Sequence, residues 1–447
     1  MQLRSKAWRA EAYALGSTAA AVTATMAAQL TISAVETLAV ARLGVAALAG
    51  VTLALSLHLL AFLFTLGVVT AVTPLAAQAH GRGDGEEASR FGQQGLLVGL
   101  VFSVPAALLL LGVGAVLVLR TGGGAEARAA GQYLLGAAWG LPAWVCYVAV
   151  RSLAVATGRV RVTTAIMVGA VPVHAALTWW LVFGGGGLPA LGAFGADLAY
   201  ALAAVAAWGL LVAIDRATAD GALGRTLRGP FRWDVPRAHA IMRLGLPFAC
   251  RIVLREGVLP VAALALVPFG AEAVAAHAVA ARVLDLAGAC CFGFSDAANV
   301  RVGAAIGAGT RHRIGFIGQV AVQLSLGVSG LLAVAIVAAS STVASLVLGP
   351  ASIRDVAAAT ALLPLVALLL VLESAQSALG GALSGMRDAR GPLVIALLST
   401  WGLGLPVGIG LAWTAATPAA GVWGGLVLGG CVTTAFYAIR FRRKLTS

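Results

Sequence analysis

Twelve long apolar runs restrict the folds that this chain can adopt. A helix needs roughly 20 apolar residues to cross the ~30 Å hydrocarbon layer of a bilayer, and each run is long enough. Only 11% of the 447 residues are charged, whereas an ordinary soluble chain carries roughly 25%. The runs lack the period-2 alternation of membrane strands, and only helices or closed barrels satisfy the backbone within lipid. The sequence therefore predicts an all-α integral membrane protein.

The membrane helices are expected where the apolar runs lie. The first run is too long for a signal peptide and no convincing cleavage site follows it, so we expect it to be retained as a helix. The twelve predicted spans are 12–40, 45–78, 93–119, 129–150, 162–183, 191–214, 241–267, 273–300, 314–338, 356–384, 391–414 and 420–439.

The basic residues indicate how the chain crosses the membrane. A net charge of +13 is also typical of nucleic-acid binding. With both termini in the cytoplasm, however, the inner connections collect 22 of the 30 lysines and arginines. The outer connections hold Arg42, Arg120, Arg128 and Arg354. This asymmetry follows the positive-inside rule. It predicts a multi-pass protein of the cell (plasma or inner) membrane with cytoplasmic termini and no nucleic-acid partner.

Residues that usually carry enzyme or metal chemistry are isolated or missing. The five cysteines all fall within predicted spans, with no CxxC pair and no histidine at metal-ligand spacing. The glycine runs at 184–187 and 303–309 are not followed by the lysine and serine of a phosphate-binding loop. Zinc-protease and serine-hydrolase motifs do not occur. We therefore expect no metal, no cofactor and no enzymatic activity.

An internal repeat divides the spans six and six. At a constant offset of 226 residues, Gly44 matches Gly270, and the same offset relates further pairs of small residues: Ala49 and Ala275, Gly67 and Gly293, Ala71 and Ala297, Gly81 and Gly307, Gly83 and Gly309. The longest polar connection separates the two sets. We expect an amino-terminal lobe at 1–214, a cytoplasmic linker at 215–240 and a carboxyl-terminal lobe at 241–447. Six spans per half place both halves in the same orientation.

Several stretches resemble one transporter family in their order and spacing. They are "VETLAVARLGVAALAG" and "TAVTPLAAQAHGRGD" in the first half, and "RLGLPFACRIVLREG", "NVRVGAAIGAG" and "GLGLPVGIGLAW" in the second. They are similar to the multidrug and toxic compound extrusion (MATE) transporters, closest in pattern to the bacterial norfloxacin-exporter branch. The resemblance implies two pseudo-symmetric six-helix lobes around a central cavity. It also implies export of small, often cationic, organic compounds driven by inward protons or sodium.

Three glutamates lie deepest in the predicted spans: Glu36, Glu256 and Glu373. An ionised side chain there costs roughly 2.5–3.5 kcal/mol on insertion scales, so it usually faces a cavity or a partner. The branch that the chain resembles carries acids at the corresponding places, which implies ion-coupling or substrate sites. The pKa of glutamate is about 4.3 in water and rises on desolvation, which permits proton exchange. The alternative for Glu36 is a structural salt bridge with Arg42.

Other polar residues in the first half extend this hypothesis. Proton-coupled members of the family often carry Asn and Asp in helix 5, where this chain has His174 and Thr178, and helix 6 carries Asp197 and Tyr200. If the lobe closes as the resemblance implies, Glu36, His174, Asp197 and Tyr200 converge as a proton-binding cluster. A histidine near pKa 6.5 is a plausible proton carrier, and the alternative is a packing role.

In the second half, arginines lie close in sequence to the acids of the predicted spans. Arg251 and Arg255 lie one turn apart on the span that carries Glu256, and Arg282 precedes Asp285 by three residues. These are possible charge partners that would neutralise the nearby acids. The alternative is that Arg251 snorkels to the cytoplasmic face and that Arg282 and Asp285 form a structural pair.

Leu369 and the remaining histidines give further expectations. The branch that the chain resembles has a sodium-binding tyrosine at the position of Leu369, so protons are expected as the coupling ion, with sodium as the alternative. His58 and His277 are expected to pack in the interior. Tryptophans towards the span ends are expected in the interfacial belt: Trp8, Trp139, Trp144, Trp233, Trp413 and Trp423.

The sequence therefore predicts a monomeric secondary exporter in the lipid bilayer that moves small organic molecules. One alternative is a lipid flippase of the same superfamily that handles an anionic lipid, which the intramembrane arginines favour and the count of twelve spans disfavours. A second alternative is an intramembrane enzyme acting on lipids. The missing metal and nucleophile motifs make it the least favoured.

Overall fold

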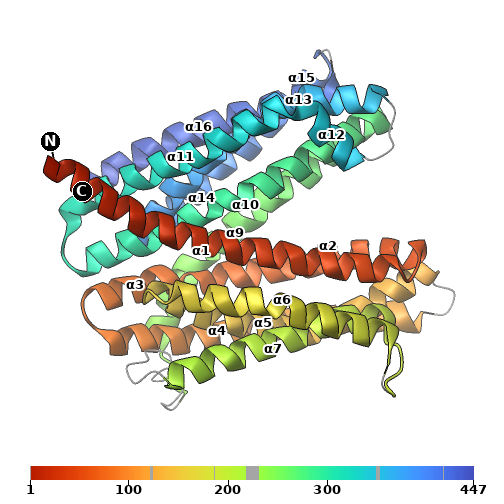
Figure 1. Cartoon of the computed structure of the whole chain (residues 1–447), viewed down its shortest axis with the longest axis horizontal. Coiled ribbons are helices and arrows are strands. Elements are labelled where there is room, and N and C mark those ends of the chain that lie inside the picture. Colours follow the sequence, from red (N-terminus) through yellow and green to blue (C-terminus); the bar gives the residue numbers. More distant parts are fainter. Residues whose placement is uncertain are drawn as a thin grey trace. The chain divides into compact units, whose positions relative to one another are not determined.

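The computed structural model describes residues 2–120, 124–185, 187–217, 231–348, 353–415 and 417–446, and within these ranges the regular structure is helical with no strand (Figure 1). Twelve helical segments are long and apolar enough to cross a membrane. They are 6–41, 45–81, 85–119, 125–156, 160–183, 192–214, 235–269, 271–307, 311–338, 356–385, 390–412 and 418–446. The prediction of an all-α protein with twelve membrane helices is confirmed.

The helices follow one another with short connections. In chain order they are α1 (Gln2–Ala41), α2 (Val45–Thr70), α3 (Val72–Gly81), α4 (Gly85–Leu119), α5 (Ala125–Ala156), α6 (Val160–Phe183), α7 (Gly192–Ala217), α9 (Val235–Leu266), η1 (Val267–Phe269), α10 (Ala271–Gly307), η2 (Arg311–Arg313), α11 (Ile314–Ala338), α12 (Ser340–Leu348), α13 (Ile353–Gly385), α14 (Arg390–Ala396), the π-helical η3 (Leu397–Gly404), α15 (Leu405–Ala412) and α16 (Pro418–Thr446).

The helices extend past the apolar runs at their polar ends. The span expected from residue 93 belongs to α4, which begins at Gly85. Asp84 caps this helix, because its carboxylate accepts a hydrogen bond of 2.9 Å from the backbone N–H of Glu87. The helix therefore includes polar residues before its apolar run, and the length of that run alone does not predict where the helix begins.

The chain forms two compact units. The amino-terminal unit is Ala24–Cys250, and the carboxyl-terminal unit is Met1–Thr23 together with Arg251–Ser447. Both boundaries fall inside long helices, α1 and α9, rather than in a connection. The lobes expected at 1–214 and 241–447 remain a prediction, and residues 218–230 of the expected linker lie outside the described residues.

The backbone repeats at the sequence offset of 226 residues. Gly44 precedes α2 with a φ of 110°, and Gly270 precedes α10 with a φ of 97°. Gly83 and Gly309 follow α3 and α10 with φ values of 79° and 72°. Residues with a side chain rarely adopt a positive φ of this size, which explains why these four positions hold glycine in both halves.

Two close helix crossings also correspond at this offset. A Cβ on Gly67 of α2 would lie 2.4 Å from the Cα of Ala249 on α9. A Cβ on Gly293 of α10 would lie 2.3 Å from the carbonyl oxygen of Ala19 and 2.8 Å from Oγ1 of Thr23 on α1. Because Thr23 and Ala249 are themselves 226 residues apart, each half makes the same crossing. The start of α1 packs in the carboxyl-terminal unit, and the start of α9 packs in the amino-terminal unit.

Buried Glu11 fixes the start of α1 in the carboxyl-terminal unit. Its carboxylate accepts hydrogen bonds of 2.8 and 2.7 Å from Nε and Nη2 of Arg301, and one of 3.0 Å from Nη2 of Arg313. The side chain of Glu11 is 1% exposed. A bidentate pair of this kind stabilises only this arrangement, because either partner alone would leave a charge without compensation.

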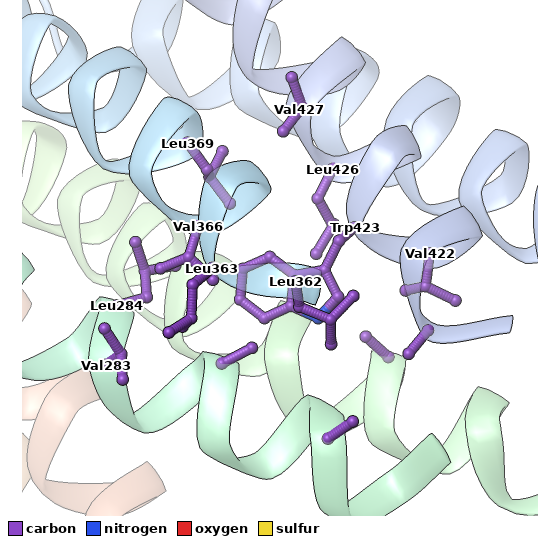
Figure 2. Packing of buried hydrophobic residues seen from close by; sticks show 14 of the residues in the cluster. Val283, Leu284, Leu362, Leu363, Val366, Leu369, Val422, Trp423, Leu426 and Val427 are labelled. Atoms are coloured by element: carbon purple, nitrogen blue, oxygen red, sulfur yellow. The ribbon is translucent and has the colours of Figure 1, made fainter. Parts of the chain in front are cut away.

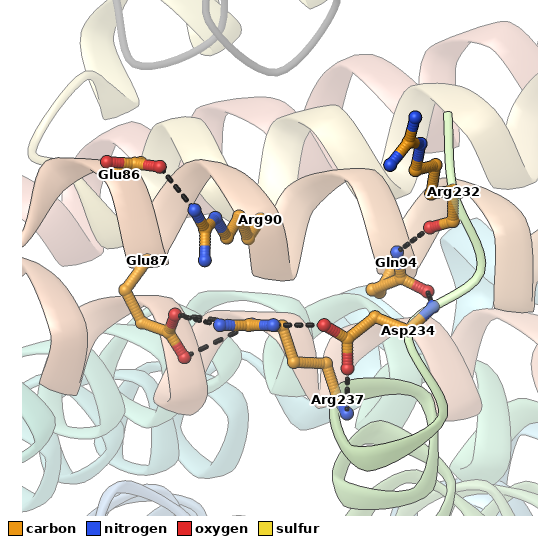
Figure 3. Close-up of polar contacts among 7 residues, drawn as sticks. All are labelled: Glu86, Glu87, Arg90, Gln94, Arg232, Asp234 and Arg237. Carbon is orange, nitrogen blue, oxygen red and sulfur yellow. Dashed lines mark hydrogen bonds and ion pairs between the residues drawn. The ribbon is translucent and has the colours of Figure 1, made fainter. Parts of the chain in front are cut away.

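Arg237 fixes the start of α9 in the amino-terminal unit (Figure 3). Its guanidinium donates to Glu87 of α4 at 2.6 Å and also to Asp234. The backbone N–H of Arg237 and the adjacent guanidinium lower the pKa of Asp234, so this carboxylate stays ionised at neutral pH. Gln94 of α4 completes the contact by donating to the Arg232 carbonyl and accepting from the Asp234 N–H.

The contacts of Glu11 and of Arg237, here called the two clamps, occupy equivalent positions in the two halves and have reversed charge. Glu11 corresponds to Arg237 at the offset of 226 residues, and Glu87 corresponds to Arg313. If the start of each helix packed in the other unit, Glu11 would face Glu87 and Arg237 would face Arg313. Like charges disfavour that arrangement, while opposite charges stabilise the observed one. The reversed polarity therefore selects which unit receives each helix start.

The apolar core of the carboxyl-terminal unit surrounds Trp423 of α16 (Figure 2). The placement of Trp423 in an interfacial belt is wrong, because its side chain is 0% exposed. Its indole N–H donates to Nδ1 of His277 at 3.2 Å, and Nε2 of His277 lies 3.1 Å from the Leu259 carbonyl. The packing interpretation of His277 is confirmed. Leu369 belongs to the same core and offers no oxygen to a cation.

We expect Glu11→Gln to lower the free energy of unfolding by about 1–3 kcal/mol, because two arginines lose their carboxylate while staying partly solvated. The matched control is Glu86→Gln, whose side chain is 70% exposed in a pair with Arg90, and it should change stability by less than about 0.5 kcal/mol. Thermal unfolding of the detergent-solubilised protein measures both. Equal effects of the two variants would contradict the assigned role of Glu11.

Candidate functional site

Two carboxylates meet inside the amino-terminal unit. Glu36 lies on α1, Asp197 lies on α7, and their side chains interact electrostatically. Asp197 is 0% exposed, and the buried Oε1 of Glu36 and both oxygens of Asp197 have no hydrogen bond of good geometry within the described chain. No described arginine or lysine forms an ion pair with either acid. Two acids without a cation are a site at which one proton stabilises the pair.

A tyrosine and a histidine complete the surroundings of the acid pair. The hydroxyl of Tyr133 on α5 faces both Glu36 and Asp197. Nδ1 of His58 on α2 lies 3.7 Å from Oδ1 of Asp197. His58 was expected only to pack, whereas the structure places it against the acid. The sequence signal for both residues was a polar side chain in an apolar run, which by itself does not show where the side chain points.

Small residues bring α7 close enough for Asp197 to reach this position. A Cβ on Gly136 of α5 would lie 2.8 Å from the Phe194 carbonyl oxygen and 3.3 Å from the Cβ of Asp197. A Cβ on Gly140 would lie 3.6 Å from Oδ2 of Asp197. The two glycines are one turn apart and form the surface of α5 that α7 contacts.

Tyr200 lies beside the acid pair, and His174 lies against Tyr200. The two rings meet edge to face with centroids 6.0 Å apart, and Nε2 of His174 lies 3.3 Å from Oγ1 of Thr178. Tyr200 also interacts electrostatically with both acids. The structure thus brings Glu36, Asp197 and Tyr200 together, and it places His174 against Tyr200 rather than in a hydrogen bond with either carboxylate.

Two alternatives from the sequence are overturned in this unit. Trp144 was expected near the membrane interface, but it is 1% exposed and stacks on Tyr200 with centroids 4.4 Å apart. Arg42 was considered as a salt-bridge partner of Glu36, but its guanidinium lies over the ring of Trp179 at 5.7 Å. Helix rotation decides both cases, because it directs each side chain to a neighbour that sequence spacing does not reveal.

In the carboxyl-terminal unit, Arg255 lies between the other two glutamates. Its Nη2 is 3.4 Å from Oε2 of Glu373 on α13, and its Nη1 is 3.8 Å from Oε1 of the adjacent Glu256. The side chains are 37%, 23% and 41% exposed for Arg255, Glu373 and Glu256. The two acids of this unit are therefore compensated by a guanidinium, unlike the pair in the amino-terminal unit.

The remaining charges of this unit have different surroundings. Asp285 is within electrostatic reach of Arg255, Glu256 and Glu373. Arg282 influences Asp285 more weakly, and within the described residues the two form no direct ion pair. Arg251 lies beside the Tyr437 hydroxyl. The alternative of a structural Arg282–Asp285 ion pair is therefore not found among the described residues.

Comparison with known proteins places this arrangement among membrane transporters. The MatE family model matches residues 21–180 and 259–409. A probable multidrug resistance protein NorM of Bradyrhizobium diazoefficiens is 33% identical over 405 residues, covering 90% of this chain and 87% of that protein. A protein with the same description from Rhodopseudomonas palustris is 33% identical over 449 residues, covering 98% and 93%.

Solved structures resemble the whole chain in fold. One is the outward-facing conformation of a multidrug resistance MATE family transporter of the MOP superfamily, with a TM-score of 0.85, 19% identity, and coverage of 98% of this chain and 96% of that chain. Another is the Vibrio cholerae MATE transporter VcmN in its bent form, with a TM-score of 0.86, 18% identity, and coverage of 99% and 98%.

We expect Gly136→Ala to destabilise the protein by about 1–3 kcal/mol, because the added methyl group meets the backbone of α7 and displaces Asp197. The control is Gly112→Ala on α4, where a Cβ meets nothing within 4 Å and helix propensity favours alanine by about 0.5–1 kcal/mol. Thermal unfolding followed by tryptophan fluorescence tests the pair. Similar shifts in both variants would contradict the proposed contact.

Proposed function

Because the chain belongs to the multidrug and toxic compound extrusion family, we propose that it exports small organic compounds in exchange for protons that enter through the amino-terminal unit. The protein is a membrane transporter and not an enzyme. Its matched relatives are described as multidrug resistance proteins. Protons are the proposed coupling ion, and Glu36 and Asp197 are their proposed carriers.

The acid pair is the observation that carries the proposal. Within the described chain, Glu36 and Asp197 have no basic partner, and neither oxygen of Asp197 receives a hydrogen bond of good geometry. When both acids are ionised, repulsion and the loss of hydration destabilise the site, and one proton relieves both. A cationic substrate would stabilise the ionised pair equally well. Proton and substrate therefore compete for the same charge, which is what exchange requires.

The flanking residues are proposed to assist this exchange. Tyr133 donates to whichever carboxylate is ionised, and His58 and Tyr200 border the pair. His174 is proposed as a further proton carrier next to Tyr200. One proton that moves down 100 mV and one pH unit supplies roughly 3.7 kcal/mol, which supports a several-hundred-fold substrate gradient at one-to-one exchange.

The wider mechanism follows from the family. We propose alternating access to a central cavity by a monomer with cytoplasmic termini in the cell membrane. The anionic-lipid alternative loses its main support, because Arg255 already lies between two glutamates and Arg251 lies beside Tyr437. Sodium coupling at Glu256 and Glu373 is disfavoured for the same reason, and Leu369 supplies no oxygen.

The test reconstitutes the protein in liposomes and follows ethidium or a fluoroquinolone under an imposed proton gradient and, separately, an imposed sodium gradient. The proton gradient should drive wild-type transport, and Glu36→Gln or Asp197→Asn should reduce it to the leak of empty liposomes, because a neutral amide cannot exchange a proton. Glu86→Gln removes an exposed acid of the same unit and should leave transport intact. Transport that persists in both site variants would exclude the acid pair as the proton carrier.

A further inference from the structure

The ion pairs around Arg255 are longer than those that Asp388 and Glu11 form in the same unit. The distances to Glu373 and Glu256 are 3.4 and 3.8 Å. By contrast, Arg440 approaches Asp388 at 2.6 and 2.9 Å, and Glu11 approaches Arg301 at 2.7 Å. Long and partly exposed pairs are weak, so Arg255 holds its two acids loosely.

Neighbouring groups keep Arg255 in place without a tight ion pair. Its guanidinium lies 4.1 Å from the ring centroid of Phe292, a cation–π distance. A Cβ on Gly288 would lie 4.0 Å from its Nη2, an ordinary contact distance, so this turn of α10 borders the guanidinium. Trp401, on the π-helical segment η3, donates to the Leu254 carbonyl at 3.1 Å. Phe292 therefore gives the guanidinium a contact that involves neither glutamate.

The charges that face Arg255 sum to an excess of acid. Asp285 joins Glu256 and Glu373 around the guanidinium. Arg282 has a smaller electrostatic effect on Asp285 than Arg255 has, and Arg251 lies beside Tyr437. Without Arg255, three carboxylates from three helices would face one another within the membrane, which is a strong cation-binding arrangement. Within the described residues, Arg255 is the guanidinium that forms ion pairs with two of these acids.

We propose that Arg255 is the resident cation of the carboxyl-terminal unit: it occupies the place that a free metal cation would otherwise take among Glu256, Glu373 and Asp285. A cationic substrate displaces the guanidinium from Glu373 and Glu256, and Phe292 holds the displaced guanidinium until the substrate leaves. This inference rests on the proposed function and adds to it which unit takes up the coupling ion. The carboxyl-terminal unit takes up no coupling ion, and the proton site of the amino-terminal unit alone sets the coupling.

A binding experiment tests the proposal without transport. The melting temperature of the purified protein is measured in detergent with rising NaCl, against choline chloride at the same ionic strength. Arg255→Gln should gain a sodium-specific rise of about 2 °C at a concentration about tenfold above its dissociation constant. The wild type should show no sodium-specific rise. Arg255→Met, which removes the charge and keeps an unbranched side chain, is the second variant and should behave like Arg255→Gln.

Arg440→Gln is the matched control. It also removes a guanidinium from a carboxylate in the same unit. Arg440 pairs with one acid, Asp388, rather than with a group of three. No sodium-specific rise in melting temperature is therefore expected. The absence of a rise in both Arg255 variants would overturn the proposal, and so would an equal rise in the wild type.

A transport measurement separates this proposal from the proposed function. In liposomes, a sodium gradient should alter ethidium movement by Arg255→Gln and leave the wild type unaffected. If the wild type moves no ethidium under any gradient, the proposed function fails, while the melting temperatures still decide the role of Arg255. If Arg255→Gln transports ethidium with no response to sodium, the resident-cation role is overturned and the proposed function stands.

Discussion

The free energy of placing a charge within a bilayer governs the whole structure. A charged side chain there needs a partner, a proton or an aqueous surface, and the charged residues of this chain illustrate these solutions. Glu11 and Arg237 form tight pairs near helix starts. Glu36 and Asp197 interact with each other and have no basic partner among the described arginines and lysines. Arg255 has loose pairs with two glutamates. The tight pairs join helices that are distant in sequence, whereas the loose or incomplete ones are the proposed sites of ligand exchange.

The two clamps also explain how a duplicated chain avoids ambiguous packing. Its halves share glycines, helix crossings and backbone conformations at an offset of 226 residues, so each helix start would fit either half by shape alone. Charge removes this degeneracy, because Glu11 and Arg237 occupy equivalent positions with opposite sign. Arg313 and Glu87 reverse in the same way. The backbone is thus repeated in both halves, and the charges of the two clamps, which are not repeated, make the packing specific.

The candidate sites of the two units differ in whether a basic side chain lies among the acids. The acid pair of the amino-terminal unit has no described basic partner and suits a proton or a cation. In the carboxyl-terminal unit the guanidinium of Arg255 already lies among the acids. Pseudo-symmetry of the backbone is therefore not accompanied by symmetry of chemistry. Glycines at 136 and 140 position Asp197, and Phe292 positions Arg255, so apolar and small residues decide where each charge acts.

The sequence by itself determined the class of the protein, because the bilayer imposes a length and a composition on every spanning helix. It also indicated Glu36, Asp197, Glu256 and Glu373, since an acid in an apolar run is conspicuous. Only the tertiary structure decided partners. It placed His58 beside Asp197, Trp144 on Tyr200, and Arg42 on Trp179 rather than on Glu36. The physical reason is that hydropathy depends on residue type along one chain, whereas a partner depends on the rotation and crossing of helices distant in sequence.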